Sequence, residues 1–328
     1  MARSFIRISE SENMKRFLSN CICFFLLLLL VSFILWVYAR GAKKDAYLLA
    51  RLDKHEIMMK TPSPKVVFVG GSNLAFGIDC SQIEDSIGFT CVNMGLHAGQ
   101  GLRFIMDDID PYIKELDKDA GDVVVLMPEF EHFFGETSNG GTTTMGELLV
   151  TDPRSIEIMD AKQILRAFKG VPKQLTGTIM ETLFASHGAS TFKYLRSNFD
   201  EEGDEIGHLK MAYDNTRTPI PPHIVIKDDL NKVFCTYFKE KVLEWQEYAT
   251  VVVFPETIYI GYVNDNFEQL SSLENELKLL GIPYYTTIDM FSYQYDKMFK
   301  APDHITGDGV TDNSGRVGHL LKAIVIKE

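Results

Sequence analysis

The sequence is short of positive charge. Its 33 lysines and arginines are outnumbered by 45 aspartates and glutamates, which gives a formal net charge of −12. Because binding to a phosphate backbone needs a basic surface, this balance argues against a nucleic-acid partner. An anionic lipid surface would also repel the chain as a whole, although a local basic segment can still bind one.

Cysteine is scarce, and no group of residues has the spacing of a metal site. Cys21 and Cys23 lie in an apolar run, which leaves Cys80, Cys91 and Cys235. We expect these three to be buried free thiols rather than to include a Cys80–Cys91 disulfide.

The glycines at 70–71 lack the Gly-Lys-Ser/Thr ending of a phosphate-binding loop, which argues against a nucleotide. The sequence therefore predicts neither a metal nor another cofactor.

A long uncharged run stands out near the N-terminus. Residues 21–39 contain no charged side chain, and at about 1.5 Å per residue they nearly span a hydrocarbon core of about 30 Å. The run is too long for the apolar part of a usual signal peptide, and no small-x-small cleavage site follows it. We therefore expect a retained transmembrane helix at 17–39, after a short tail at 1–16.

Basic residues flank both ends of this helix, so the positive-inside rule comes close to a tie. The short tail carries four of them, Arg3, Arg7, Lys15 and Arg16. We therefore expect a single-pass membrane protein with its N-terminus in the cytoplasm and its C-terminal domain outside. The lipid bilayer is then a partner of the chain.

The rest of the chain alternates between apolar strands and amphipathic helices. After a helical stalk and linker at 40–64, we expect an α/β domain over 65–328. Its expected strands are at 66–69, 91–94, 122–127, 250–254 and 283–288. Its expected helices are at 81–87 with Ser81 as N-cap and Glu84 completing a capping box, and at 102–116, 231–248, 267–280 and 313–326. This alternation predicts a doubly wound parallel sheet with helices on both faces.

Residues 133–230 break the alternation and are expected to form an insertion or cap. Helical stretches at 156–168 and 174–186 and an acidic loop at 200–205 fall within it. The residue pattern indicates no function for this segment.

The most informative stretch is 66–73, Val-Val-Phe-Val-Gly-Gly-Ser-Asn. The apolar residues predict a buried strand, and the two glycines permit a sharp turn and a close backbone approach. Ser72 then stands at the carboxyl end of a strand, where open α/β sheets bind ligands and backbone N–H groups favour anions. The alternative is a turn serine that caps a helix.

These residues resemble motifs of the SGNH (GDSL-type) hydrolase superfamily. Gly70-Gly71-Ser72-Asn73 is similar to its first block, Val92-Asn93-Met94-Gly95 to its second, and Asn313-Ser314-Gly315-Arg316 to the segment that follows its catalytic histidine. The resemblance covers 65–127 and 250–328, and is to the membrane-anchored branch associated with acylation of cell-surface polysaccharides. It implies a three-layer, flavodoxin-like fold.

The resemblance also implies roles for single residues. Ser72 would be the nucleophile, and its own N–H and that of Gly95 would bind the oxyanion, with Asn73 as a further donor. The family's third block supplies an asparagine where this chain has Met127-Pro128-Glu129-Phe130-Glu131-His132. One oxyanion donor is therefore missing or replaced.

The catalytic histidine is also displaced from the family's pattern, which places it five residues before the glycine of the final helix. Counting back from Gly315 reaches Val310, and three residues further reaches Gly307. Neither can act as a base. We expect His304 to be the base, with Asp303 or Asp308 orienting it, and His319 is a further candidate.

Other polar residues follow the same strand ends. Asn93, His97, Glu129, Glu131 and His132 are expected to line the site, although Asn93 and His97 also suit structural hydrogen bonds.

Two functions remain open. The first is a serine acyl esterase or transferase, acting on a cell-surface or exported polysaccharide. The second is a catalytically degenerate protein that binds a glycan or scaffolds polysaccharide-assembly membrane proteins.

Overall fold

The computed structural model describes residues 2–184, 193–209, 211, 220, 223–282 and 286–325. At its centre is a parallel sheet of four strands in the order β2-β1-β3-β4. The strands are β1 (Lys65–Gly70), β2 (Thr90–Asn93), β3 (Val123–Met127) and β4 (Thr250–Val253). The α/β class, with a parallel sheet, is therefore confirmed. A small second sheet pairs β5 (Ile258–Tyr259) with β6 (Ser292–Tyr293) in parallel.

Both faces of the main sheet are apolar, because β1 and β3 are buried along their whole length. Alternate residues of each strand belong to two separate cores, as the pleat of a strand requires. Val67 and Val69 pack with α5 (Leu102–Ile113), α8 (Lys232–Trp245) and α10 (Phe267–Leu279). Val66 and Phe68 pack with α4 (Cys80–Ile87) and α11 (Gly307–Val325).

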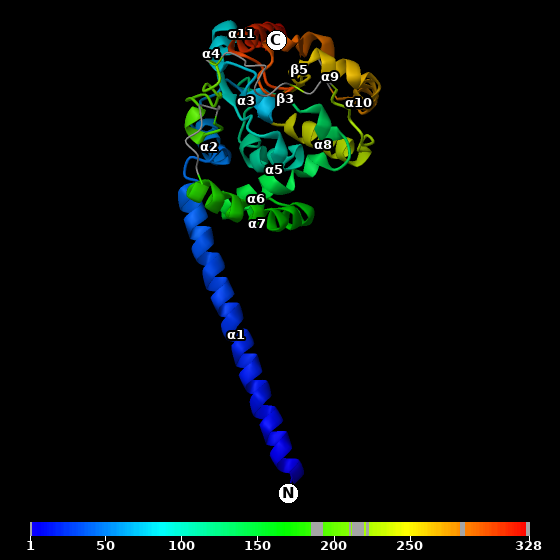
Figure 1. Ribbon diagram of the computed structural model, residues 1–328. Coiled ribbons are helices and arrows are strands. Elements are labelled where there is room, and N and C mark those ends of the chain that lie inside the picture. Colours follow the sequence, from blue (N-terminus) through cyan, green and yellow to red (C-terminus); the bar gives the residue numbers. More distant parts are fainter. Residues whose placement is uncertain are drawn as a thin grey trace.

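The N-terminal helix α1 (Ala2–Ala42) runs away from the domain as a single rod (Figure 1). Residues Asn13–Ala42 are long and apolar enough to cross a membrane. This confirms an apolar N-terminal helix that is compatible with a single membrane pass. The helix continues beyond the predicted end at residue 39.

The segment after α1 is part of the domain rather than a free stalk. It forms a short 3-10 helix η1 (Tyr47–Leu49) and then α2 (Ala50–Lys60). Ala50, Lys54 and Met58 recur at a helical spacing of four and are all buried. Residues 45–60 therefore pack one side against the domain.

Several predicted boundaries differ from the structure. The N-cap of α4 is Asp79, whose carboxylate accepts a hydrogen bond from the Gln82 amide at 3.1 Å, and not Ser81. Glu84 accepts a bond from the Cys91 amide of β2 instead of completing a capping box. The last helix begins at Gly307 instead of residue 313. Half of the strand expected at 283–288, residues 283–285, lies outside the described residues; the described half is not a strand, and a 3-10 helix begins at Ile288.

The expectation of three free thiols was wrong. Cys80 and Cys91 form a disulfide, with their Cα atoms 5.3 Å apart. Cys80 begins α4 and Cys91 lies in β2. The chain turns back after α4, so that β2 passes beside the first turn of that helix. Cys235 is a buried free thiol, as expected.

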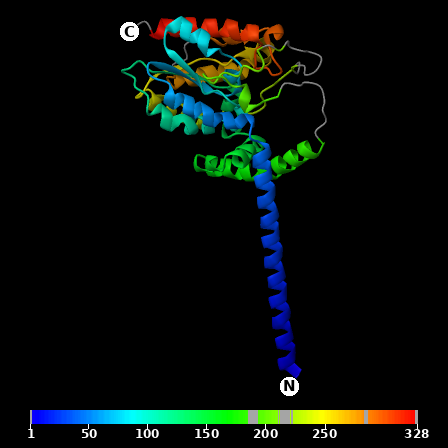
Figure 2. The same cartoon turned by 90° about the vertical axis from the view of Figure 1, so that its left-hand side faces the viewer.

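Two packed helices form the base of the domain. They are α6 (Thr142–Thr151) and α7 (Ala161–Phe184), and α7 is continuous where two helices were expected. Figure 2 shows α7 lying crosswise to α1, at the level where α1 meets the domain. The remaining short elements are α3 (Ser72–Ala75), α9 (Ile260–Asp265), η2 (Ala98–Gln100), η3 (Phe130–Phe133), η4 (Thr137–Asn139), η5 (Pro153–Glu157), η6 (Arg196–Asn198), η7 (Ile288–Phe291) and η8 (Tyr295–Lys297).

Candidate functional site

Ser72 lies at the carboxyl edge of the main sheet and is partly exposed. Its Oγ donates a long hydrogen bond of 3.4 Å to Asp303 Oδ2. The same carboxylate oxygen lies 3.6 Å from His304 Nε2. Neighbouring residues of an extended strand point to opposite sides, but here the chain turns, and the Thr257 hydroxyl donates to the Asp303 carbonyl at 3.0 Å. The structure thus brings Ser72, Asp303 and His304 together, with Asp303 in the middle.

The His304 ring is buried, with only 5% of the residue exposed. It stacks on Phe76, with ring centroids 4.2 Å apart and planes 10° apart. Neither ring nitrogen has a hydrogen-bond partner among the described residues. Burial lowers the pKa of His304, and the charge of Asp303 only partly opposes this effect. The imidazole is therefore neutral near pH 7 and can accept a proton.

A second buried pair packs against the same aromatic cluster. His208 Nδ1 lies 2.6 Å from Glu205 Oε2, and both side chains are almost fully buried. The His208 ring centroid is 4.8 Å from that of Phe76. Sequence reasoning missed both residues because they lie in the segment to which no role was given. Their i, i+3 spacing was the available signal.

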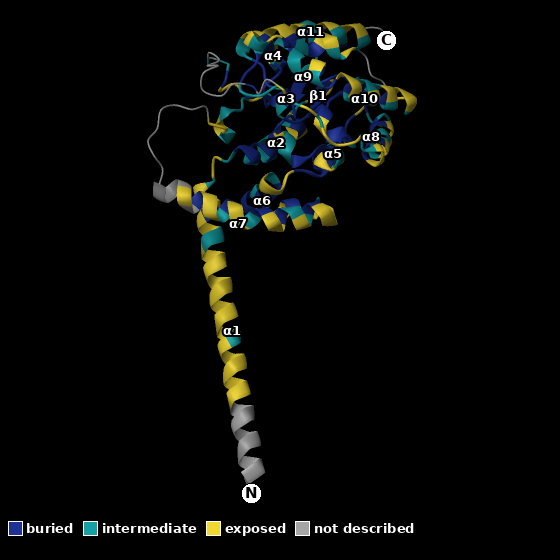
Figure 3. Cartoon of the chain, turned by 45° about the vertical axis from the view of Figure 1, so that its right-hand side comes forward, coloured by how far each residue is buried: buried dark blue, intermediate teal, exposed yellow. Residues whose placement is uncertain are grey.

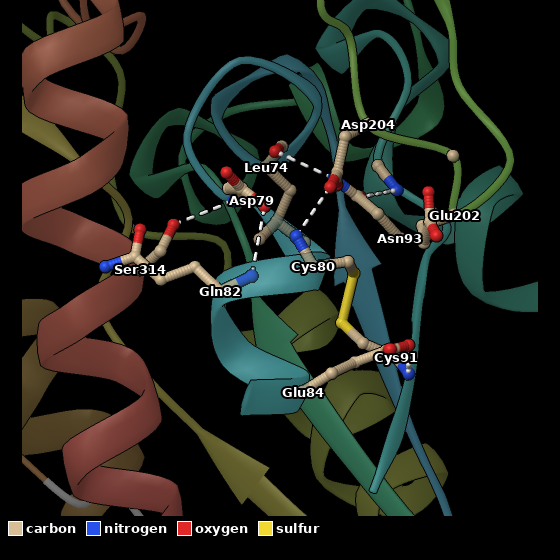
Figure 4. Close-up of a disulfide and its surroundings, with 12 residues drawn as sticks. Leu74, Asp79, Cys80, Gln82, Glu84, Cys91, Asn93, Glu202, Asp204 and Ser314 are labelled. Carbon is tan, nitrogen blue, oxygen red and sulfur yellow. Dashed lines mark hydrogen bonds between the residues drawn. A yellow bond between two sulfur atoms is a disulfide. The ribbon is translucent and has the colours of Figure 1, made fainter. Parts of the chain in front are cut away.

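Asn93 holds the turn after β2. Its Nδ2 donates to the Leu74 carbonyl at 3.1 Å and to Asp204 Oδ1 at 2.7 Å (Figure 4). Its Oδ1 accepts from the Gly95 amide at 2.8 Å. The Gly95 N–H, expected to bind an oxyanion, is therefore engaged by Asn93. A side chain at Gly95 would collide with Leu74, which explains why the turn needs glycine.

A buried lysine supports this turn from α2. Lys54 Nζ donates to the Asn93 carbonyl at 2.7 Å and also to the Gly203 carbonyl. Burial lowers the pKa of Lys54 to about 7. Burial likewise raises the pKa of Asp204 to about 7. In both groups burial disfavours the charged form.

Glu129 fills the space beside the serine turn. Its Oε1 accepts a long hydrogen bond of 3.5 Å from the backbone N–H of Asn73. A side chain at Gly71 would overlap the Glu129 carboxylate. The Asn73 side chain donates to the Met127 carbonyl at 2.9 Å. A carboxylate therefore stands where the resemblance expects an asparagine, and Asn73 bonds to protein groups instead of projecting a free donor.

His132 is paired with Glu129 in the interior. Its Nδ1 lies 3.3 Å from Glu129 Oε2, and its Nε2 lies 2.9 Å from the Ala98 carbonyl. Burial alone would lower the pKa of His132, but the pairing with Glu129 outweighs it and the pKa is raised.

Glu256 is a further buried carboxylate that sequence reasoning missed. Its Oε1 accepts from the Phe130 amide at 2.7 Å. Burial, followed by the charges of Glu129 and Asp303, raises the pKa of Glu256 well above its usual value. The signal was its position, because Glu256 follows β4 as Glu129 follows β3.

The other candidates make no bond to this group among the described residues. Asp308, in the first turn of α11, and His319, further along it, are exposed. His97 is exposed and its Nδ1 accepts from the Gly99 amide at 2.8 Å; Glu131 is exposed next to Phe130. No hydrogen bond or ion pair between described residues joins these four to Ser72 or His304. The described residues also contain no cluster of three or more His, Cys, Asp or Glu that could hold a metal ion.

Comparisons of the chain with protein-family models, with curated proteins and with solved structures find no match. A partly exposed hydroxyl stands beside a carboxylate and a neutral imidazole with no hydrogen-bond partner among the described residues, which are the groups that acyl transfer from serine requires.

Proposed function

We propose that the protein is a membrane-anchored serine acyl esterase or acyltransferase with an SGNH-like, three-layer fold. Its substrate is an acyl group, such as acetyl, that is carried as an ester on a cell-surface or exported polysaccharide. The observation that carries the proposal is the contact of Ser72 with Asp303, whose carboxylate also lies 3.6 Å from the ring of His304.

The reaction balances with the groups present. Ser72 Oγ attacks the carbonyl carbon of the ester, and its proton passes to the Asp303–His304 pair. The tetrahedral intermediate then expels the leaving alkoxide, which takes up that proton. Attack by a glycan hydroxyl or by water on the acyl-serine releases the acyl group and restores the Ser72 hydroxyl.

The spacing of the last motif supports the proposed fold once the true start of α11 is used. Gly309 lies in the first turn of α11 and stands five residues after His304, which is the spacing of the resembled family. A side chain at Gly309 would press on Ile305, so a glycine is needed there. The family's acid, three residues before the histidine, is Ala301 in this chain. We propose that Asp303 replaces that acid as the carboxylate beside His304.

The disulfide supports a domain outside the cytoplasm. Cross-links such as Cys80–Cys91 persist in oxidising compartments and are rare in the cytosol. The basic tail before α1 favours the same orientation. Anchoring would hold the domain close to membrane-linked donors and so raise their effective concentration.

One observation favours a second candidate, a glycan-binding protein without catalysis. The backbone N–H of Gly95 donates to Asn93, and the backbone N–H of Asn73 donates to Glu129. Neither N–H group is therefore free to bind an oxyanion. Glu129 also brings a carboxylate to the place where negative charge would develop. A site that binds sugar hydroxyls through carboxylates fits this arrangement.

Replacement of Ser72 separates the two candidates. For an enzyme, Ser72→Ala abolishes glycan acylation in cells and labelling by a serine-directed fluorophosphonate. Ser81→Ala is the matched control, because Ser81 is exposed on α4 and outside the site. Unchanged acylation in Ser72→Ala cells would contradict the catalytic role. Retained glycan binding by that variant would then support the second candidate.

A further inference from the structure

The helix α7 has two different faces. Its inner face carries residues spaced three or four apart, which are buried: Gln163, Ala167, Gly170 and Gln174. Gly170 packs against α6 so closely that a side chain there would collide with the Thr142 carbonyl. Because this contact fixes the rotation of α7, the opposite face must point away from the domain.

That outer face is apolar. It carries Leu165, Phe168, Pro172 and Leu175, again spaced three or four apart. Leu165 is 55% exposed and Phe168 58% exposed. Large apolar side chains exposed in such a row indicate a surface that is covered in the working state.

The edge of the same face is basic, although the whole chain is acidic. Residues 161–180 contain Lys162, Arg166, Lys169 and Lys173 and no acidic residue. Lys162 and Arg166 pair with Glu136. Lys169 and Lys173 are exposed and form no ion pair within the described part of the chain; Lys173 Nζ donates to the Thr143 hydroxyl of α6 at 3.2 Å. An apolar strip edged by lysines is the pattern of a helix that lies in a membrane interface.

The position of α7 relative to α1 identifies what covers it. Lys43 follows α1 and donates to Gln174 of α7 at 2.8 Å. Lys43 comes four residues after the end of the apolar run at Ala39, a rise of about 6 Å, which places it in the headgroup layer. Trp36 and Tyr38 mark the same boundary. Figure 3 shows α7 crosswise to α1, at the end of the domain from which α1 departs.

We propose that the outer face of α7 lies in the interface of the bilayer that α1 crosses, with Leu165 and Phe168 inserted among the lipids and Lys169 and Lys173 at anionic headgroups. The domain then has two attachments to the membrane and a defined orientation on it. This inference is independent of the catalytic proposal, because it uses no residue of the site.

Fluorescence quenching by lipid tests the proposal on the full chain. Trp36→Phe removes the tryptophan of α1, and the remaining Trp245 is fully buried. Phe168→Trp in that background is reconstituted into vesicles whose lipids carry bromine near the headgroup end of the acyl chains. The control is Phe267→Trp, at a 69% exposed position of α10. We expect emission of the Phe168→Trp protein to fall about twofold or more, as for an interfacial side chain, and that of the control to stay unchanged.

Equal emission of the Phe168→Trp protein in brominated and ordinary vesicles would overturn the proposal. It would mean that α7 faces water, another protein or a second copy of the chain. The basic edge has its own test, Lys169→Glu with Lys173→Glu in the Phe168→Trp background. Quenching should decrease in vesicles containing anionic lipid and change less in zwitterionic vesicles. An equal response in both would contradict the role of the lysines.

Discussion

The Asp303–His304 and Glu205–His208 pairs pack against the same ring, that of Phe76, yet they differ in how tightly they are held. In the second pair, carboxylate and imidazole are 2.6 Å apart, and Glu205 also accepts from the His208 amide at 3.3 Å. In the first pair, the corresponding distance is 3.6 Å, and the carboxylate also meets Ser72. A closed, multiply bonded pair stabilises the fold, whereas a loose pair beside a hydroxyl is free to exchange a proton.

The largest effect should come from exchanging the two histidines for glutamine, one at a time. His304→Gln removes the proposed base, and acylation should fall by about three to four orders of magnitude. His208→Gln breaks the closed pair, and should lower the free energy of unfolding while leaving kcat much less affected. The measurements are esterase turnover and urea unfolding of both variants. Equal losses of turnover would abolish the distinction between the pairs.

Removal of the shared ring should affect both pairs. Phe76 is fully buried, and Phe76→Ala should lower the free energy of unfolding by about 3–5 kcal/mol through the cavity it leaves. Phe267→Ala is the control, because Phe267 is exposed on α10. Chemical denaturation of the full chain in detergent measures both. A loss below about 1 kcal/mol for Phe76→Ala would show that the ring is not the common support.

Replacing the carboxylates of the two pairs should also lower stability more in the Glu205–His208 pair than in the Asp303–His304 pair, but by less than replacing Phe76. Glu205→Gln weakens a buried, charge-assisted bond and should cost about 1–3 kcal/mol of stability. Asp303→Asn should cost less, because its contacts of 3.4 and 3.6 Å are long. Thermal unfolding of the two variants ranks them. The reverse ranking would place the structural role in the Asp303–His304 pair.

The smallest expected effect is the change in folding stability with pH. Burial lowers the pKa of His304 in the folded state, so its contribution to stability is present above the unfolded pKa of about 6.5 and is lost as pH falls. His132, with a raised pKa, has the opposite sign: its contribution is present below that pH and is lost as pH rises.

The comparison that isolates His304 is wild type against His304→Gln between about pH 7 and 5. The difference in their free energies of unfolding should change across this range, because only the wild type carries the buried imidazole. Turnover of the wild type should decline only below about pH 6.5. A constant difference in stability would contradict the lowered pKa.

The four strands of the main sheet could be predicted because their apolar runs are continuous, as buried parallel strands require. The edge on which Ser72, Glu129 and Glu256 gather follows from that topology, since parallel strands end at the same side. The contacts of His304 do not follow from it. They depend on a turn before α11, whose start at Gly307 follows Thr306. The Thr306 hydroxyl accepts from the Gly309 amide at 3.4 Å, so a cap pattern was present in the sequence and was overlooked in favour of residue 313.

The residues missed in the middle of the chain have a different cause. The i, i+3 spacing of Glu205 and His208 is compatible with their pairing. It does not show that the His208 ring packs against Phe76, which is distant in sequence. The Cys80–Cys91 disulfide was missed for a similar reason: a pair of cysteines in sequence does not show whether their Cα atoms come within bonding range. The four strands of the main sheet, in contrast, follow from local apolar runs.

The disulfide has a practical consequence for work on this chain. The cross-link joins the first turn of α4 to β2, close to the Asn93 turn (Figure 4). Material produced in a reducing cytosol would carry two thiols there, and the loop bearing Gly95 would lose a covalent brace. Preparations should therefore be secreted, or folded with an oxidant, before a lack of activity is attributed to the serine.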